Sequence, residues 1–371
     1  MKFVVAIDSF KGCLTSAEAN QAAAEGIRAV RPDAEVVQVP VSDGGEGFLE
    51  AFHAAIGGEF IEVCVCDPLM RPRTARYLLK ADTAVIEIAQ ACGLTLLSAD
   101  ERNPLLATSY GVGQLVADAV RRGASHIIVG LGGSATSDAG TGMLRALIDA
   151  FAPHGTWDDL QVLPLSPLLR EGGGRGGGKK VSFTIASDVQ NPLCGANGAA
   201  HVFAPQKGAT PEMVVQLDAR ARRFAEASAR HFGYNRSQQP GAGAAGGLGY
   251  AFLQYLDATC QPGIRLLLDA LHFRDIISDA ALIITGEGSA DRQTLMGKLP
   301  MGILQQAKGI PVALIAGRIS DRKSLSQAGF AHVLSINPPH LPHAVAILPS
   351  TARQNIRETM KKLVGYSQET T

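Results

Sequence analysis

Buried strands and amphipathic helices alternate along both ends of this chain of 371 residues. The N-terminal end predicts a strand at 3–8, a helix at 16–30, a strand at 35–41 and a helix at 46–57. The same alternation returns after residue 279. When strands and helices alternate in this way, successive strands run parallel, because each helix carries the chain back along the sheet. Both ends therefore predict parts of one Rossmann-like parallel sheet.

The length of the chain predicts two α/β domains. A single hydrophobic core rarely extends beyond about 250–300 residues, and this chain is longer. We expect residues 1–60 and 271–371 to build the Rossmann-like domain, and residues 61–270 to form an inserted α/β domain. One large α/β domain is the alternative.

The overall charge argues against binding to nucleic acid or to a membrane surface. The chain has 34 basic and 34 acidic residues, so no net field attracts a polyanion or an anionic bilayer. No apolar run is long enough for a signal peptide or a membrane span. The six cysteines are scattered, which is typical of a reducing compartment. We expect a cytoplasmic protein that binds a small molecule, with its oligomeric state, homo-oligomer included, left open.

A glycine-rich turn at 132–142 follows a buried strand at 127–131 and leads into a helix. Glycines let the backbone approach a ligand, and a helix N-terminus favours an anion such as phosphate. The expected phosphate contacts are Gly132, Gly133, Ser134 and Thr136. Asp138 would hold Mg²⁺ or cap the helix, and a plain capped turn is the alternative interpretation.

Two further turns follow the first and second strands, at the edge of a parallel sheet where ligands bind. Lys11 would face a phosphate, although an exposed lysine is the alternative. In the second turn a carboxylate would hold a substrate hydroxyl or cap the following helix. The residues expected to bind the substrate are Ser9, Asp43, Gly44 and Gly45.

Two acidic strand ends complete the candidate site. Asp188 is a candidate general base for an alcohol, or else a turn-forming aspartate. Lys207 supplies another lysine on a nearby loop. Glu287 and Asp291 follow the strand at 280–285, and with Asp138 they are the expected Mg²⁺ ligands, because Mg²⁺ prefers oxygen donors.

Two glycine-rich segments match known nucleotide-binding patterns only in part. Residues 173–179 nearly match a phosphate-binding loop, but Lys180 replaces the required Ser or Thr and no strand precedes them. Residues 241–246 fit GxGxxG, but the preceding segment is polar and ends in Pro240. A nicotinamide cofactor is therefore not expected. The second motif would pack against another backbone or a ligand.

The motifs taken in order strongly resemble the bacterial type-1 glycerate kinase family over nearly the whole chain. They are DSFKG at 8–12, DGGEG at 43–47, GLGGSAT at 130–136, NPLCG at 191–195, PQKG at 205–208, PGAGAAGG at 240–247 and TGEG at 285–288. The resemblance implies ATP- and Mg²⁺-dependent phosphorylation of D-glycerate, giving 2-phosphoglycerate in many members. It also implies an active site in a cleft between two α/β domains.

The resemblance has two departures. Ile7 stands where members usually carry proline, which affects only the local backbone. Ser289 and Ala290 replace the arginine and apolar residue that usually follow GEG, so a cation near phosphate is missing unless Arg292 substitutes.

These observations together predict a small-molecule kinase with Lys11 and Asp188 as catalytic residues. One alternative is a kinase or phosphatase for another small hydroxy acid or sugar acid. The other is a non-catalytic regulator that closes two domains on a metabolite, but binding alone does not need so many acids grouped with lysines.

Overall fold

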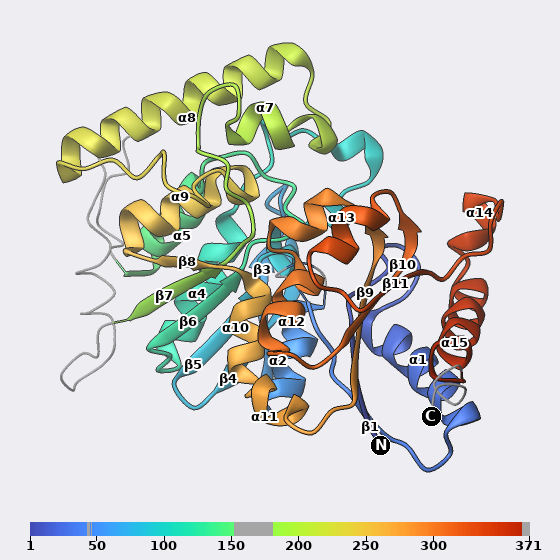
Figure 1. The fold of residues 1–371 in the computed structure, drawn as a ribbon. Coiled ribbons are helices and arrows are strands. Elements are labelled where there is room, and N and C mark those ends of the chain that lie inside the picture. Colours follow the sequence, from blue (N-terminus) through green and yellow to red (C-terminus); the bar gives the residue numbers. More distant parts are fainter. Residues whose placement is uncertain (43–44, 46, 152–180, 366–371) are drawn as a thin grey trace. The chain divides into compact units, whose positions relative to one another are not determined.

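The computed structural model describes residues 1–42, 45, 47–151 and 181–365 (Figure 1). Contacts divide the chain into two compact units. The first unit comprises Met1–Asp43 with Ile264–Thr371, and the second comprises Gly44–Gly263. Helix α2 (Phe48–Ile56) was placed with the N-terminal part on sequence grounds, but it contacts strands of the second unit.

The first unit contains a parallel sheet with the strand order β11-β10-β9-β1-β2. Chain ends that are far apart in sequence therefore share one sheet. Its strands are β1 (Lys2–Ile7), β2 (Glu35–Gln38), β9 (Leu282–Ala290), β10 (Val312–Ile319) and β11 (His332–Ser335). Strand β9 continues past the predicted end at residue 285, and Glu287 thus lies on the strand itself.

Helices α1 (Ser16–Val30) and α15 (Pro349–Gly365) lie side by side in this unit (Figure 1). A Cβ added at Gly26 of α1 would lie only 2.5 Å from the Arg357 carbonyl oxygen, so glycine permits this close approach. The remaining helices are α10 (Gly263–Ala270), α11 (Phe273–Ile277), η4 (Arg292–Met296), α12 (Leu299–Gln306), α13 (Arg322–Gln327) and α14 (His343–Ala346).

The second unit contains a mixed sheet with the strand order β3-β4-β5-β6-β7-β8. The first three strands pair antiparallel, and β5 to β8 pair parallel. The strands are β3 (Glu59–Cys66), β4 (Pro72–Lys80), β5 (Thr83–Glu87), β6 (His126–Gly130), β7 (Ser182–Ala186) and β8 (Thr259–Gln261). The α/β fold class, with a parallel sheet built from both ends of the chain, is thereby confirmed.

The helices of this unit, besides α2, are α3 (Ala89–Cys92), η1 (Leu94–Leu96), η2 (Ala99–Glu101), α4 (Tyr110–Arg121), α5 (Thr141–Phe151), α7 (Ala199–Phe203), η3 (Pro205–Lys207), α8 (Pro211–Phe232) and α9 (Ala244–Leu256). Of these, α3, α4, α5, α8 and α9 contribute residues to the hydrophobic core around the second sheet. Within the described ranges, no helix has the length and apolar character needed to cross a bilayer. All six cysteines are free, and the structure describes each of them.

Candidate functional site

In the second unit, three neighbouring parallel strands end at the same level. Glu87 of β5 pairs in register with Gly130 of β6, which pairs with Ala186 of β7. The glycine-rich turn after β6 and Asp188 after β7 therefore leave the same edge of the sheet. This edge is where open parallel sheets bind ligands.

Lys207 joins the glycine-rich turn at this edge. Its Nζ donates to Ser134 Oγ at 2.9 Å and to the Thr136 carbonyl oxygen at 2.7 Å. The side chain is buried, with 3% of the residue exposed. Burial lowers the pKa of Lys207 to about 8, because a desolvated ammonium is less stable. The structure thus brings together Lys207, Ser134 and Thr136, which the sequence predicted separately.

The turn is tied to the segment that follows β5. The Leu94 N–H donates to the Gly133 carbonyl at 2.8 Å, and the Ala135 N–H donates to the Cys92 carbonyl at 2.7 Å. Gly133 has a φ of +75°, which glycine adopts without strain. The turn is therefore preorganised. The Ala135 N–H is used within the protein, so it adds no donor for an anion.

Asp138 caps helix α5, the second of the two roles expected for it. Its Oδ2 accepts from the Ser109 N–H and from Ser109 Oγ, each at 2.8 Å, and from the Gly142 N–H at 3.2 Å. Its Oδ1 accepts from the Gly140 N–H at 3.0 Å. These donors occupy both carboxylate oxygens and leave little room for a cation.

The GxGxxG segment at 241–246 packs directly against the glycine-rich turn at 132–142. Gly246 has a φ of +66°, and a Cβ there would lie 2.0 Å from the Thr136 carbonyl oxygen. The Gly246 carbonyl in turn accepts from the Ala139 N–H at 3.0 Å. The motif was expected to pack against another backbone or against a ligand, and the structure shows that it packs against a backbone.

We expect Gly246→Ala to destabilise the protein more than Gly233→Ala. Gly233 has a similar φ of +74° but nothing within 4 Å of its added Cβ, so it isolates the cost of backbone strain. That strain costs about 1–2 kcal/mol, and the clash at Gly246 adds about 1–3 kcal/mol of overpacking. Urea unfolding of both variants measures the difference, and equal losses would contradict it.

Asp188 is half-buried just beyond β7. The preceding residue is anchored, since the Ser187 N–H donates to the Gln261 carbonyl of β8 at 3.0 Å. Ser187 Oγ accepts from the Val189 N–H at 3.2 Å and shapes the turn around the carboxylate. Burial raises the pKa of the Cys260 thiol, and the charge of Asp188 adds to that effect.

The first unit gathers the other predicted groups at its own strand ends. Ile7 of β1 pairs in register with Gly286 of β9. The turn after β1 lies against β9, because a Cβ added at Gly288 would be 3.8 Å from the Phe10 Cα. Lys11 is exposed on this turn, and the Ser9 N–H donates to Asp8 Oδ1 at 2.7 Å.

The predicted substrate loop is described only in part. Asp43 and Gly44 lie outside the described residues. The Gly45 carbonyl accepts from the Phe48 N–H at 3.2 Å, at the start of α2 in the second unit.

Glu287 and Asp291 are connected through the η4 turn. Glu287 is buried, and its Oε1 accepts from Thr294 Oγ1 at 2.5 Å. Its Oε2 lies 3.8 Å from Lys298 Nζ. Asp291 caps η4, because its Oδ1 accepts from the Gln293 N–H at 2.7 Å.

Glu287 and Asp291 are carboxylates of the kind that could take part in holding a magnesium ion. Across residues 1–42, 45, 47–151 and 181–365, no group of three or more His, Cys, Asp or Glu side chains could hold a metal alone. Mg²⁺ is commonly bound by one or two carboxylates, with phosphates and water as its other ligands. The buried Thr285 hydroxyl, two residues before Glu287, has no hydrogen-bond partner in the described part and is a further oxygen donor there.

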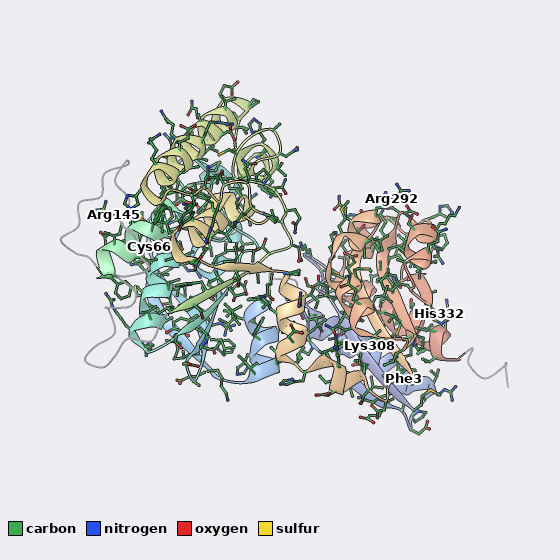
Figure 2. All side chains as sticks on the ribbon, turned by 60° about the vertical axis from the view of Figure 1, so that its left-hand side comes forward. Phe3, Cys66, Arg145, Arg292, Lys308 and His332 are labelled. Atoms are coloured by element: carbon green, nitrogen blue, oxygen red, sulfur yellow. The ribbon has the colours of Figure 1, made fainter. Side chains whose placement is uncertain are left out.

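Arg292, labelled in Figure 2, lies on the surface of the first unit. Its Nε pairs with Asp321 Oδ2 at 2.8 Å, and 79% of its side chain is exposed. Hydrogen bonding from the Ser324 N–H, followed by the Arg292 contact, lowers the pKa of Asp321 to about 2.

Two polar residues at these edges were missed on sequence grounds. Glu87 is buried at the end of β5, and its Oε2 accepts from the Leu49 N–H at 3.4 Å. The signal was an acid at the end of a strand. The other is Thr294, whose hydroxyl contacts the Glu287 carboxylate and the Asp291 N–H, and whose only signal was its place three residues after Asp291.

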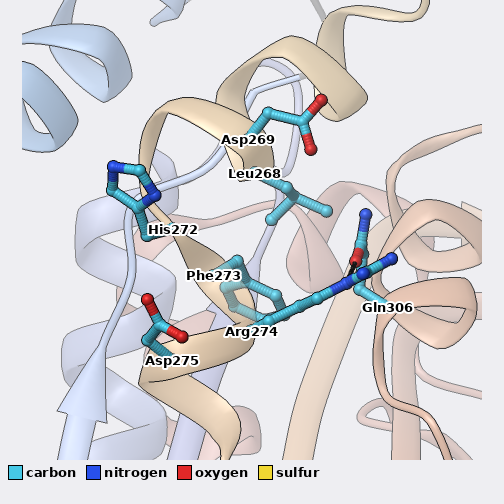
Figure 3. A pocket seen from close by; sticks show the side chains of 7 residues that line it. All are labelled: Leu268, Asp269, His272, Phe273, Arg274, Asp275 and Gln306. Atoms are coloured by element: carbon cyan, nitrogen blue, oxygen red, sulfur yellow. Dashed lines mark hydrogen bonds between the residues drawn. The ribbon is translucent and has the colours of Figure 1, made fainter.

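Two hollows in the described residues lie apart from these strand ends. One, of about 320 Å³, is lined from α10 to α12, and Arg274 Nε donates to Gln306 Oε1 there at 2.6 Å (Figure 3). The other, of about 330 Å³, is lined by α7 and α8. None of the predicted site residues lines either hollow.

Comparisons with known proteins cover nearly the whole chain. The sequence model of the glycerate kinase family matches residues 3–368. A glycerate kinase of Bacillus subtilis (strain 168) is 40% identical over 376 residues, which cover 95% of this chain and 96% of that protein. A glycerate 2-kinase of Escherichia coli (strain K12) is 41% identical, with 86% of each chain covered. A crystal structure of a candidate glycerate kinase 2 from Salmonella typhimurium LT2 is similar, with a TM-score of 0.78, 35% identity, and coverage of 99% of this chain and 98% of that one.

Proposed function

Because the chain belongs to the glycerate kinase family, we propose that it transfers the γ-phosphoryl group of ATP to a hydroxyl of D-glycerate. The main support for phosphate binding is the buried Lys207 ammonium, which donates to Ser134 Oγ and to the Thr136 carbonyl at the strand ends. A cation held in a preorganised, desolvated turn stabilises phosphate charge more than one in water.

Asp188 is the proposed general base. It accepts the proton of the glycerate hydroxyl as that oxygen attacks the γ-phosphorus, and ADP leaves with the electron pair of the broken P–O bond. Lys207 and Lys11 are the proposed cations for the phosphates. The backbone at Gly132 and Gly133 and the hydroxyls of Ser134 and Thr136 are the proposed neutral contacts.

Glu287 and Asp291 are the proposed Mg²⁺ ligands. Held by these carboxylates, Mg²⁺ would offset negative charge on the phosphate groups of the nucleotide. The helix-capping contacts of Asp138 support assigning it to the integrity of the phosphate turn instead of the metal. For the substrate we retain Ser9 and the segment of Asp43, Gly44 and Gly45 as its proposed contacts.

The 2-hydroxyl is the proposed acceptor, and 2-phosphoglycerate the product. The name of the Escherichia coli relative, glycerate 2-kinase, supports this choice. We also propose that the two contact units are the two domains of the protein, and that it acts in the cytoplasm, which the free cysteines support.

Incubation with ATP, Mg²⁺ and D-glycerate tests the proposal, with the product identified by ³¹P NMR against both phosphoglycerates. We expect ADP and 2-phosphoglycerate. Formation of 3-phosphoglycerate would contradict the choice of hydroxyl alone. Turnover only with another hydroxy acid would favour the alternative kinase, and D-glycerate binding without any ATP turnover would favour a regulator.

A further inference from the structure

We propose that Thr294 is the positioning residue that fixes Glu287 and Asp291 relative to each other as metal ligands. This inference rests on the metal role given to those two carboxylates under the proposed function. It concerns a residue that is not itself a ligand and that acts through its hydroxyl group.

The hydrogen bonds of Thr294 link both carboxylate residues. Its Oγ1 donates its proton to Glu287 Oε1 at 2.5 Å and accepts the Asp291 N–H at 3.0 Å. The Thr294 N–H donates in turn to the Asp291 carbonyl at 3.1 Å. A hydroxyl has one proton to donate, and here that proton is given to Glu287.

Burial makes this linkage rigid. Thr294 is fully buried, and its β-branched side chain has few rotamers to choose from. Thr294 holds Glu287 Oε1, while Oε2 lies 3.8 Å from Lys298 Nζ. One hydroxyl thus contacts both the carboxylate of Glu287 and the backbone of Asp291.

The geometry resembles the way proteins orient metal ligands in general. Carboxylates that bind metals are usually held by a further hydrogen bond, and losing that bond typically weakens metal affinity about 10–100-fold. The sequence D-x-x-T at residues 291–294 also forms a reciprocal helix cap, so the same residue begins η4. A purely structural cap would affect stability without affecting metal affinity.

The test compares Thr294→Val, which keeps the shape but lacks the hydroxyl, with Thr294→Ser, which keeps the hydroxyl. Mn²⁺ is titrated into each full-length protein with ADP in fixed excess, and the loss of the free Mn²⁺ EPR signal is measured against a protein-free mixture. We expect Thr294→Val to weaken protein-bound Mn²⁺ about tenfold or more, and Thr294→Ser to stay within a few-fold of the wild type. If Thr294→Val fails to fold, Thr294→Ala is compared with Thr294→Ser in the same way.

The variant Glu287→Gln separates the metal role of Glu287 from the positioning role of Thr294. If it weakens Mn²⁺ binding while folded Thr294→Val matches the wild type, the metal role stands and the positioning role is overturned. If Glu287→Gln has no effect, or the wild type takes up no Mn²⁺, the metal role fails and the inference fails with it. A lower melting temperature of Thr294→Val with unchanged Mn²⁺ affinity would show a structural cap only, and would also overturn the inference.

Discussion

We expect Asp188→Asn to lower kcat by about 10²–10⁴-fold, the usual contribution of a general base, and to leave the KM for ATP within a few-fold of the wild type. The amide keeps the size of the carboxylate but cannot accept the proton of the attacking hydroxyl. Steady-state kinetics with D-glycerate and ATP measure both constants.

A matched control for this variant is Asp257→Asn. Asp257 is another aspartate of the second unit, with 60% of its side chain exposed and paired with Arg236. Its backbone is left-handed, a conformation that asparagine also tolerates. We expect the control to retain the wild-type kcat. An unchanged kcat in Asp188→Asn would remove Asp188 from the catalytic role.

Lys207→Met lowers kcat/KM for ATP by about 10²–10³-fold, as the loss of a preorganised charge donor does in other active sites. Methionine fills the space, but the Ser134 hydroxyl and the Thr136 carbonyl lose their common donor. The exposed Lys80, at the end of β4 in the same unit, supplies the control Lys80→Met. Wild-type kcat/KM in Lys207→Met would rule out the buried cation as a phosphate contact.

The pH profile offers a second readout for Lys207. Its lowered pKa of about 8 means that the side chain is cationic below that pH and loses its charge above it. We therefore expect kcat/KM for ATP in the wild type to fall above about pH 8, and Lys207→Met to lack this fall. Unfolding does not account for it, because a lysine whose pKa is lowered by folding stabilises the folded state as the pH rises from about 8 toward its unfolded value.

The sequence predicted the fold well where periodicity is strong. The elements of the first unit follow the predicted alternation, because β1 and β10 are buried apolar runs and α1 has one apolar face. The family resemblance drawn from the ordered motifs is confirmed by the match over residues 3–368. Local pattern could not show that α2 packs on the second sheet, because that depends on long-range contacts.

The sequence allowed us to predict which candidate residues follow the ends of strands, but not which side chains they contact. An aspartate after a glycine turn is equally typical of a metal ligand or a helix cap, and only the structure shows that Asp138 accepts the Gly140 and Gly142 N–H groups at the start of α5. Lys207 and Ser134 are 73 residues apart in sequence, so no local pattern joins them. Thr294 has an ordinary sequence context, and only the structure shows that its hydroxyl lies between the Glu287 carboxylate and the Asp291 N–H.

Our central proposal is that Lys207 of the glycine-rich turn and the carboxylate of Glu287 are each required for phosphoryl transfer. The most direct test is the single-turnover rate with radiolabelled ATP and D-glycerate, measured by rapid quench at saturating Mg²⁺ in Lys207→Met and Glu287→Gln. The account predicts that each substitution alone slows transfer about tenfold or more, a loss of at least about 1.4 kcal/mol of transition-state stabilisation. Transfer at the wild-type rate in either variant would contradict it.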